Sequence, residues 1–305
     1  MATRGLILAA ALLGTLGVCW AVGTVLIYRR EPVLTPDLPK SSSGRRIQVG
    51  SHSVRILERG SGSPLLLVAG TGGSVASWPE SVVQRLSSHH HVVAVDLFGM
   101  GFSDRSADLS YSFALWSEEL VSVLDVLGLQ RASIVGHSVG GSVAIFMAAN
   151  HPERVDRVIL VGSAVSVPWW FLVVMTPGIG ELFLASNDVF GPTISASHLE
   201  EAIAAYRIRG TRDALIRYVR HSPFEARKFF AAIESVHVPV LQLHGVNDTE
   251  VLIAAAERLH DRLQSSRLVP VQGAGHFVMV DAPNMFTTYV ESFLDDPAVS
   301  TSLRD

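Results

Sequence analysis

The sequence contains little cysteine and little charge. Cys19 is the only cysteine among 305 residues, so the chain can form neither an internal disulfide nor a cysteine-based zinc site. Charged residues make up 17% of the total, and 24 Lys and Arg against 28 Asp and Glu give a formal net charge of −4. No run of Lys or Arg is present, which argues against a nucleic acid as partner. Hydrophobic residues make up 48%, which excludes a disordered chain and suggests that part of the excess lies in a membrane segment.

The longest run without a charge lies near the N-terminus. Gly5–Tyr28 comprises 24 uncharged residues. At about 1.5 Å per residue, a helix of this length spans roughly 36 Å, enough to cross a hydrocarbon core of about 30 Å. The apolar region of a signal peptide is shorter, about 7–15 residues, and Arg29-Arg30 is a poor cleavage site. We therefore expect residues 1–30 to form a retained single-pass membrane anchor, with a cleaved signal peptide as the alternative. The excess of basic residues after this run favours a cytoplasmic catalytic part.

After this run, prolines mark a predicted linker, and short apolar runs mark the predicted strands of a folded domain. Residues 31–44 contain three prolines and a Ser/Gly run, which is typical of a linker. From residue 45 on, apolar runs alternate with helical patterns, which predicts an α/β fold with a mostly parallel eight-stranded sheet. The predicted strands are Arg46–Val49, Ser53–Glu58, Leu65–Ala69, Val92–Asp96, Ala132–Gly136, Val155–Val161, Val240–His244 and Arg267–Val271. The predicted helices are Trp78–Ser88, Phe113–Leu127, Val139–Asn150, Ile253–Leu263 and Pro283–Leu294.

One interval interrupts this alternation. Between Gly162 and Val238 the sequence shows no strand pattern, only helix-like segments that are interrupted by prolines, among them Pro223. We expect residues 163–237 to form a helical cap that is inserted into an α/β core made of residues 45–162 and 238–297.

A candidate nucleophile lies in the pentapeptide Gly136–Gly140, which has the pattern G-x-S-x-G. The pentapeptide follows an apolar strand and begins a helical pattern, so Ser138 is expected on a sharp strand-to-helix turn that exposes its hydroxyl. Because a serine hydroxyl is a weak nucleophile, it needs a base to take its proton and a third group to orient that base. His276 follows the last predicted strand, and Asp248 follows the strand before it. The carboxyl ends of parallel strands share one edge of the sheet, so we predict a catalytic triad of Ser138, Asp248 and His276.

The sequence from about Arg45 to Leu294 resembles the α/β-hydrolase fold superfamily. The resemblance is carried by Ala69–Gly73, Asp96–Asp104, the Ser138 pentapeptide, Asn247-Asp248 and Gly275-His276, in the chain order Ser, Asp, His. It implies that the N–H groups of Thr71, in the loop after the third strand, and of Val139 form the oxyanion hole. Many relatives have His-Gly where this chain has Ala69-Gly70, a change that leaves backbone donors available.

Other polar residues have structural interpretations. His89-His90-His91 is interpreted as a solvated turn between a helix and a strand rather than as a metal site. His137 is expected to pack beside the pocket, His244 to be structural, and Asp96 to brace a loop. We expect no metal and no cofactor. Asn247-Asp248-Thr249 matches a glycosylation sequon, and because a glycan there would crowd the predicted acid, this also favours a cytosolic or bacterial setting.

The substrate class is suggested by the apolar residues at the start of the predicted cap. Pro168–Met175 is almost entirely apolar, so it forms core, touches a bilayer or lines an acyl pocket. We expect a serine hydrolase that cleaves a small hydrophobic ester or lipid, similar to monoacylglycerol lipases and carboxylesterases. Two alternatives stay open: a C–C bond hydrolase of a diketone-type substrate, which uses the same three residues, and a catalytically silent binding protein on the same fold.

Overall fold

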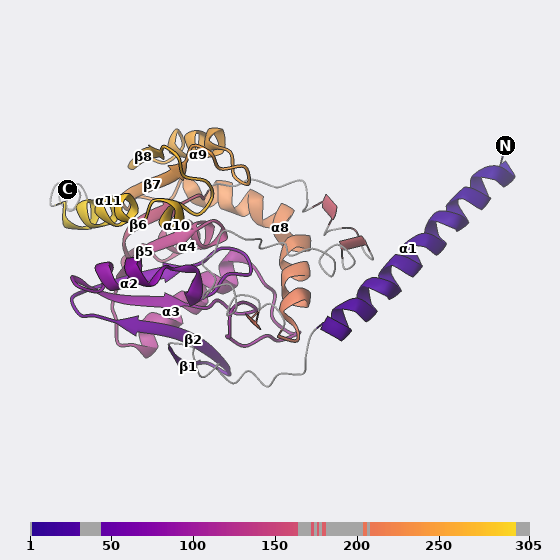
Figure 1. Cartoon of the computed structure of the whole chain (residues 1–305), viewed down its shortest axis with the longest axis horizontal. Helices are drawn as coiled ribbons and strands as arrows, with labels where there is room; N and C mark the ends of the chain where they lie inside the picture. The colour runs from indigo at the N-terminus through magenta and orange to yellow at the C-terminus, as the bar shows by residue number, and fades with distance from the viewer. Residues whose placement is uncertain are drawn as a thin grey trace.

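A single sheet of eight strands forms the centre of the molecule (Figure 1). The structure, a computed structural model, describes residues 2–30, 44–163 and 208–296 and a few positions between 172 and 205. The strand order is β1-β2-β4-β3-β5-β6-β7-β8, and all pairs from β4 to β8 are parallel, whereas β2 is antiparallel to both β1 and β4. The strands are β1 (Arg45–Val49), β2 (His52–Arg59), β3 (Ser63–Val68), β4 (His90–Val95), β5 (Ala132–His137), β6 (Val155–Val161), β7 (Val240–Gly245) and β8 (Ser266–Val271).

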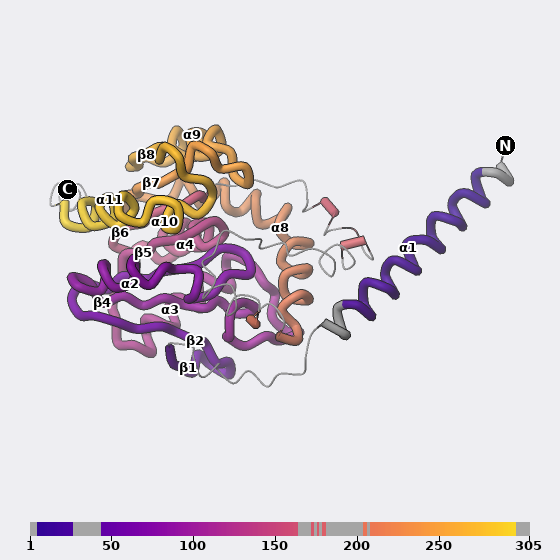
Figure 2. The backbone as a smooth tube through the Cα atoms, in the orientation of Figure 1, coloured from indigo at the N-terminus to yellow at the C-terminus, as the bar shows by residue number. Residues whose placement is uncertain are grey.

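All eight predicted strands are confirmed, with ends that shift by no more than two residues. The helices in the described core and C-terminal part are α2 (Glu80–Leu86), α3 (Phe113–Val126), α4 (Val139–Asn150), α8 (Thr211–Ile233), α9 (Ile253–His260), α10 (Val278–Asp281) and α11 (Pro283–Asp295). In Figure 2 the C-terminal part from β7 to α11 lies at one edge of the sheet beside β6, and β1 and β2 lie at the opposite edge. The Val/Leu/Ile runs are explained by this topology because a parallel strand is covered by helices on both faces.

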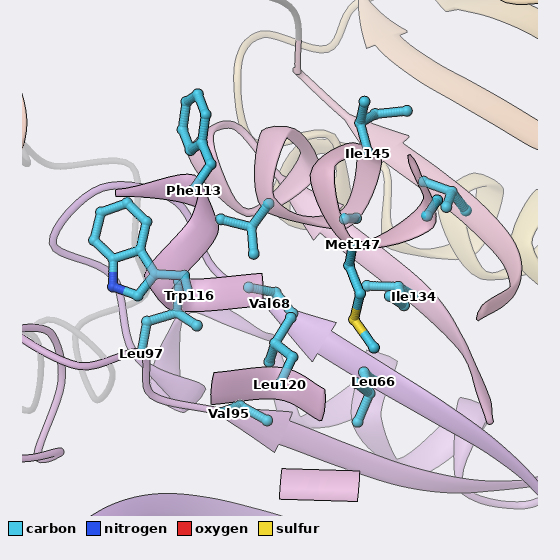
Figure 3. Close-up of a cluster of buried hydrophobic side chains, with 14 of the residues drawn as sticks. Leu66, Val68, Val95, Leu97, Phe113, Trp116, Leu120, Ile134, Ile145 and Met147 are labelled. Atoms are coloured by element: carbon cyan, nitrogen blue, oxygen red, sulfur yellow. The ribbon is translucent and has the colours of Figure 1, made fainter. Parts of the chain in front are cut away.

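Side chains that alternate along the strands form two separate cores. Leu66 and Val68 of β3 pack with α3, α4 and α8 on one face of the sheet, whereas Leu65 and Leu67 pack with α2, α10 and α11 on the other. Figure 3 shows the first of these clusters, in which Trp116 and Leu120 of α3 and Met147 of α4 lie against Leu66, Val68 and Ile134 of the sheet. The two cores fix the sheet rigidly, so the loops at its edge start from defined positions.

Two sequence-based expectations need correction. Pro223 does not interrupt a helix but lies inside α8. A proline at position 223 cannot donate to the carbonyl of Val219, and Ser222 compensates because its Oγ donates to that carbonyl at 2.7 Å. The His89–His91 tract is not a solvated turn throughout, because His90 is buried in β4 and His91 Nε2 lies 2.8 Å from Glu58 Oε1. Within the described residues, no group of three or more His, Cys, Asp or Glu is placed to hold a metal ion.

The N-terminal helix stands apart from these cores. The helix α1 spans Ala2–Arg30, and its stretch Gly5–Leu26 is apolar enough to cross a membrane by length and composition. A membrane anchor and a signal sequence both meet this description. Most of the predicted linker (31–44) and about half of the predicted cap (163–237), including all of the run Pro168–Met175 except Leu172 and Val173, lie outside the described residues.

Candidate active site

Ser138 occupies a strained turn between β5 and α4. Its φ of 51° and ψ of −120° make it the only non-glycine residue in the described chain with a positive φ. Such a backbone costs about 1–3 kcal/mol and persists only where its surroundings hold it. Here the Ser138 N–H donates to Val161 O at 2.9 Å, and Ser163 Oγ donates to Ser138 O at 2.7 Å. The end of β6 therefore holds the turn in place and leaves the Ser138 side chain projecting from the sheet edge.

Two glycines make this turn possible by allowing close packing. A Cβ on Gly136 would overlap the backbone of Gly140, the second residue of α4. A Cβ on Gly140 would in turn overlap the carbonyl of Val68 at the end of β3. Strand, turn and helix thus approach one another at backbone distance, which explains in physical terms why the glycines flank Ser138.

Asp248 and His276 meet at the same edge of the sheet. Asp248 follows β7 and His276 follows β8, and His276 Nδ1 donates to Asp248 Oδ2 at 2.8 Å. The other carboxylate oxygen, Oδ1, accepts the N–H groups of Glu250 at 2.9 Å and Val251 at 2.8 Å. Because the Asp248 side chain is fully buried and its oxygens are satisfied, it fixes the imidazole in one orientation with the proton on Nδ1.

Two further buried histidines support this pair. His244 Nε2 donates to Val251 O at 2.6 Å and lies 3.4 Å from Asp248 Oδ2. His137 Nε2 donates to the carbonyl of His276 at 3.2 Å, and the rings of these two residues lie 4.7 Å apart. Burial lowers the pKa of both His137 and His244, which favours the neutral form of each imidazole. The expectations of a packed His137 and a structural His244 agree with these contacts.

Ser138 and His276 are brought to one edge but are not hydrogen-bonded to each other in the described structure. The end of β6 lies between them. Val161, its last residue, accepts the N–H of Ser138. Gly162, the next residue, lies so close to the His276 backbone that a Cβ on it would be 2.6 Å from His276 O. The His276 Nε2 atom lies 3.7 Å from Glu250 Oε2. Sequence reasoning missed Glu250, because nothing in a lone acidic residue two positions after Asp248 signals such a contact. Catalytic hydrogen bonds are often long before substrate binds, so this geometry is typical of a resting site.

The loop after β3 lies directly against Ser138. A Cβ on Gly70 would lie 2.9 Å from Ser138 Cβ, which places the Thr71 backbone beside the Ser138 turn. The Thr71 N–H donates no hydrogen bond to any residue that the structure describes. The Val139 N–H is the first of α4, a position that has no partner inside the helix. Both N–H groups are therefore available to a negatively charged oxygen.

Asp96 braces this loop from behind. Its fully buried carboxylate accepts the N–H of Val75 at 2.6 Å and the N–H of Phe102 at 2.7 Å, and it lies 3.4 Å from Arg55 Nη1. Val75 follows the loop of residues 70–74, and Phe102 lies in the loop after β4. The two hydrogen bonds to Asp96 therefore connect the loop after β3 to the loop after β4. The expectation that Asp96 braces a loop agrees with these contacts.

An apolar cavity adjoins the same loop. It offers a water-sized molecule only about 10 Å³, roughly the space of one water. The cavity is lined mainly by Gly72, Phe98, Tyr111, Trp116, Leu215 and Tyr218. Neither Ser138 nor His276 lines it, so it extends from the loop after β3 toward α3 and α8 rather than surrounding these two residues.

Comparison with known proteins identifies relatives over most of the chain. The family model described as alpha/beta hydrolase fold matches residues 63–181, and a second model, described as TAP-like protein, matches residues 221–302. A 2-hydroxymuconate semialdehyde hydrolase of Pseudomonas putida is 30% identical over 280 residues, which covers 82% of this chain and 94% of the relative.

Solved structures show the same fold. A meta-cleavage product hydrolase from Pseudomonas fluorescens IP01 is 25% identical with a TM-score of 0.69 and covers 83% of this chain and 98% of its own. A membrane phospholipase A is 24% identical with a TM-score of 0.64 and covers 99% of this chain and 100% of its own.

Proposed function

The chain belongs to the alpha/beta hydrolase fold family and is a hydrolase, and on this premise we propose that it is a serine hydrolase that cleaves a carboxylic ester with a hydrophobic acyl group. The catalytic triad in this proposal is Ser138, Asp248 and His276. The observation that carries it is the 2.8 Å hydrogen bond between His276 and buried Asp248, at the edge where the strained Ser138 turn also lies.

In the proposed reaction the Ser138 hydroxyl attacks the carbonyl carbon of the ester. His276 Nε2 takes the hydroxyl proton, and Asp248 stabilises the imidazolium that forms. This step requires Nε2 to exchange its contact with Glu250 for one with Ser138 Oγ. The N–H groups of Thr71 and Val139 donate to the carbonyl oxygen as it gains negative charge.

Attack by Ser138 gives a tetrahedral intermediate, which then breaks down to an acyl-enzyme and finally to the free acid. The C–O bond to the leaving alcohol breaks, and the alcohol takes the proton from His276, which leaves an acyl group on Ser138. A water molecule attacks this acyl group while His276 removes one of its protons. The acid is released and the Ser138 hydroxyl is restored.

Three observations support a hydrophobic acyl group. The small cavity beside Gly72 is lined mainly by aromatic and aliphatic side chains, so the loop after β3 has an apolar surface behind it that would favour a hydrophobic group. The apolar run Pro168–Met175 belongs to the segment that we propose as an inserted cap, residues 163–237, between the two halves of the core. The apolar helix Gly5–Leu26 supports residues 1–30 as a membrane anchor, which would place the hydrolase near lipid substrates. We further propose a cytoplasmic catalytic part.

A second candidate function is favoured by the relatives' names. A 2-hydroxymuconate semialdehyde hydrolase and a meta-cleavage product hydrolase both match most of this chain, which supports cleavage of a carbon–carbon bond in a diketone-type substrate. The two candidates use the same three residues and differ in the bond that breaks. A substrate comparison therefore separates them.

The experiment compares 4-nitrophenyl esters of graded chain length with a vinylogous diketone, using the full chain in neutral detergent. We expect ester hydrolysis that rises with acyl length and disappears in S138A but not in S122A, a control at an exposed serine of α3. Diketone cleavage without ester cleavage would select the second candidate. A fluorophosphonate probe that labels the wild type but not H276A would exclude a catalytically silent protein, whereas failure to label Ser138 would overturn both enzymatic proposals.

A further inference from the structure

Glu250 is the residue at the site that the reaction above does not use. Its Oε2 atom lies 3.7 Å from His276 Nε2, the nitrogen that faces the reacting atoms in the proposed mechanism. Its side chain is 54% exposed, in contrast to the buried Asp248 on the other side of the ring. Glu250 is also held in place, because its N–H donates to Asp248 Oδ1 at 2.9 Å. The imidazole thus lies between two carboxylates, one buried and the other exposed.

The surroundings of Glu250 are acidic rather than balanced. Asp281 Oδ2 accepts the N–H of Gly275, next to His276, at 2.8 Å. Three carboxylates therefore surround the loop that carries the imidazole, and among the residues that the structure describes no Lys or Arg forms an ion pair with any of them. Burial favours the neutral form of the neighbouring His137 and His244, which therefore offset little of this charge.

The first part of the proposed cap, residues 163–206, continues the same pattern, whereas residues 207–237 contain seven Arg and Lys against three acidic residues. Between Arg157 and Arg207 the chain has no Lys or Arg at all, whereas it has four acidic residues, Glu181, Asp188, Glu200 and Glu201. A site that receives a carboxylate-bearing substrate normally supplies a cation to bind it. Nothing in this half of the cap sequence supplies one.

We infer that Glu250 is a specificity-determining residue that favours cationic and neutral substrates over anionic ones at the proposed Ser138 site. The inference rests on the proposed function, because it needs Ser138 as the nucleophile. A negatively charged group about 7 Å from Glu250 would be repelled, and Coulomb's law between the dielectric constants of a protein surface and of water gives a penalty of about 3- to 50-fold in rate. A carboxylate-bearing substrate, of either candidate reaction, is disfavoured in the same way.

The test measures how fast Ser138 is labelled, so that it needs no knowledge of the natural substrate. Three fluorophosphonates with tails of one length end in a trimethylammonium, a tert-butyl or a carboxylate group. Ser138 Oγ attacks phosphorus, fluoride leaves, and the second-order rate constant is followed by intact mass of the full chain in neutral detergent. We expect rates in the order cationic, neutral, anionic, with at least a threefold step at each comparison.

Two variants assign the preference to Glu250. In E250Q the three rates should converge, whereas in E257Q, the same change at an exposed glutamate of α9, the order should stay as in the wild type. Raising the salt concentration to about 1 M, where the Debye length is about 3 Å, should also compress the wild-type order without any mutation.

The outcomes separate this inference from the proposed function. Equal labelling by all three probes in the wild type, or the same order in E250Q as in the wild type, would overturn the role of Glu250 and leave Ser138 as the nucleophile. No labelling of Ser138 by any probe would overturn the proposed function, and the inference with it.

Discussion

Asp96 and Asp248 look alike until their partners are compared. Each lies just past the end of a strand in the same sheet, each has a fully buried carboxylate, and each accepts two backbone N–H groups. Asp96 faces Arg55, which is positively charged at every relevant pH, whereas Asp248 faces His276, which can take and release a proton.

The partner therefore decides what each carboxylate contributes. The pair of Asp96 and Arg55 has one charge state, so it can only hold loops together, and Arg55 also lies over the ring of Phe102 at 5.1 Å. The pair of Asp248 and His276 has two charge states, so it can follow a proton through a reaction. Burial and position in the sheet are shared by the two sites and do not distinguish a brace from a catalytic acid.

The largest effect expected from this comparison is on activity at Asp248. D248N keeps an acceptor for the backbone N–H groups but removes the charge that stabilises the imidazolium, so we expect kcat/KM for an ester to fall by about 10³- to 10⁴-fold. The urea midpoint should change little. A fall of less than tenfold in D248N, measured on folded protein, would contradict the role given to Asp248.

The next effect is on stability at Asp96. D96N removes the buried carboxylate charge that lies 3.4 Å from the Arg55 guanidinium, and we expect the free energy of unfolding in urea to fall by about 3–5 kcal/mol. Activity of the folded fraction should stay within about tenfold of the wild type. As a matched control, R55M/D96N removes both charges of the buried pair and should recover part of the loss. A catalytic defect of about 10³-fold with normal stability would instead make Asp96 part of the chemistry.

The smallest effect is at a third buried carboxyl group, Glu119 of α3. Both its oxygens accept the Phe98 N–H, and within the described chain no cation contacts it. Burial, with a smaller contribution from the charge of Asp96, raises the pKa of Glu119 well above its usual value of 4.5. The folded state therefore keeps a proton that the unfolded state has already lost.

This difference makes stability depend on pH with a definite sign. As pH rises above 4.5, the wild type loses stability until it passes the folded-state pKa of Glu119. E119Q removes this dependence, so its free energy of unfolding relative to the wild type should rise between pH 5 and pH 8, with a difference within about 1 kcal/mol at pH 5. A relative stability that falls over this range would show that Glu119 is charged in the folded protein.

Much of this arrangement could be predicted from the sequence because it follows from periodicity. Runs of Val, Leu and Ile predict strands covered on both faces, and the ends of such strands fix where Ser138, Asp248 and His276 lie. The role of Asp96 was predicted from its place beside a glycine turn, and its contacts with Val75 and Phe102 agree.

The remaining features depend on side chains that meet across the fold. Proline normally interrupts a helix, but Pro223 lies inside α8 because the Ser222 hydroxyl donates to the carbonyl that Pro223 leaves without a backbone donor. His90 is buried because β4 begins at His90, two residues before the apolar run that starts at Val92. The approach of Glu250 to His276 is set by how two loops turn back over the sheet edge. No pattern of spacing in one sequence carries that information.

The single thiol of this chain, half-exposed in α1, has a practical consequence. Cys19 is the only cysteine in the sequence. Cleavage of α1 as a signal peptide would therefore leave a protein without any thiol, whereas a retained membrane anchor keeps one thiol per molecule. The number of thiols per molecule in protein isolated from cells therefore shows whether the N-terminal helix has been cleaved. The Cys19 sulfur can also carry one spin label or dye without any substitution elsewhere in the chain. Such a label would measure how deeply α1 lies in a bilayer.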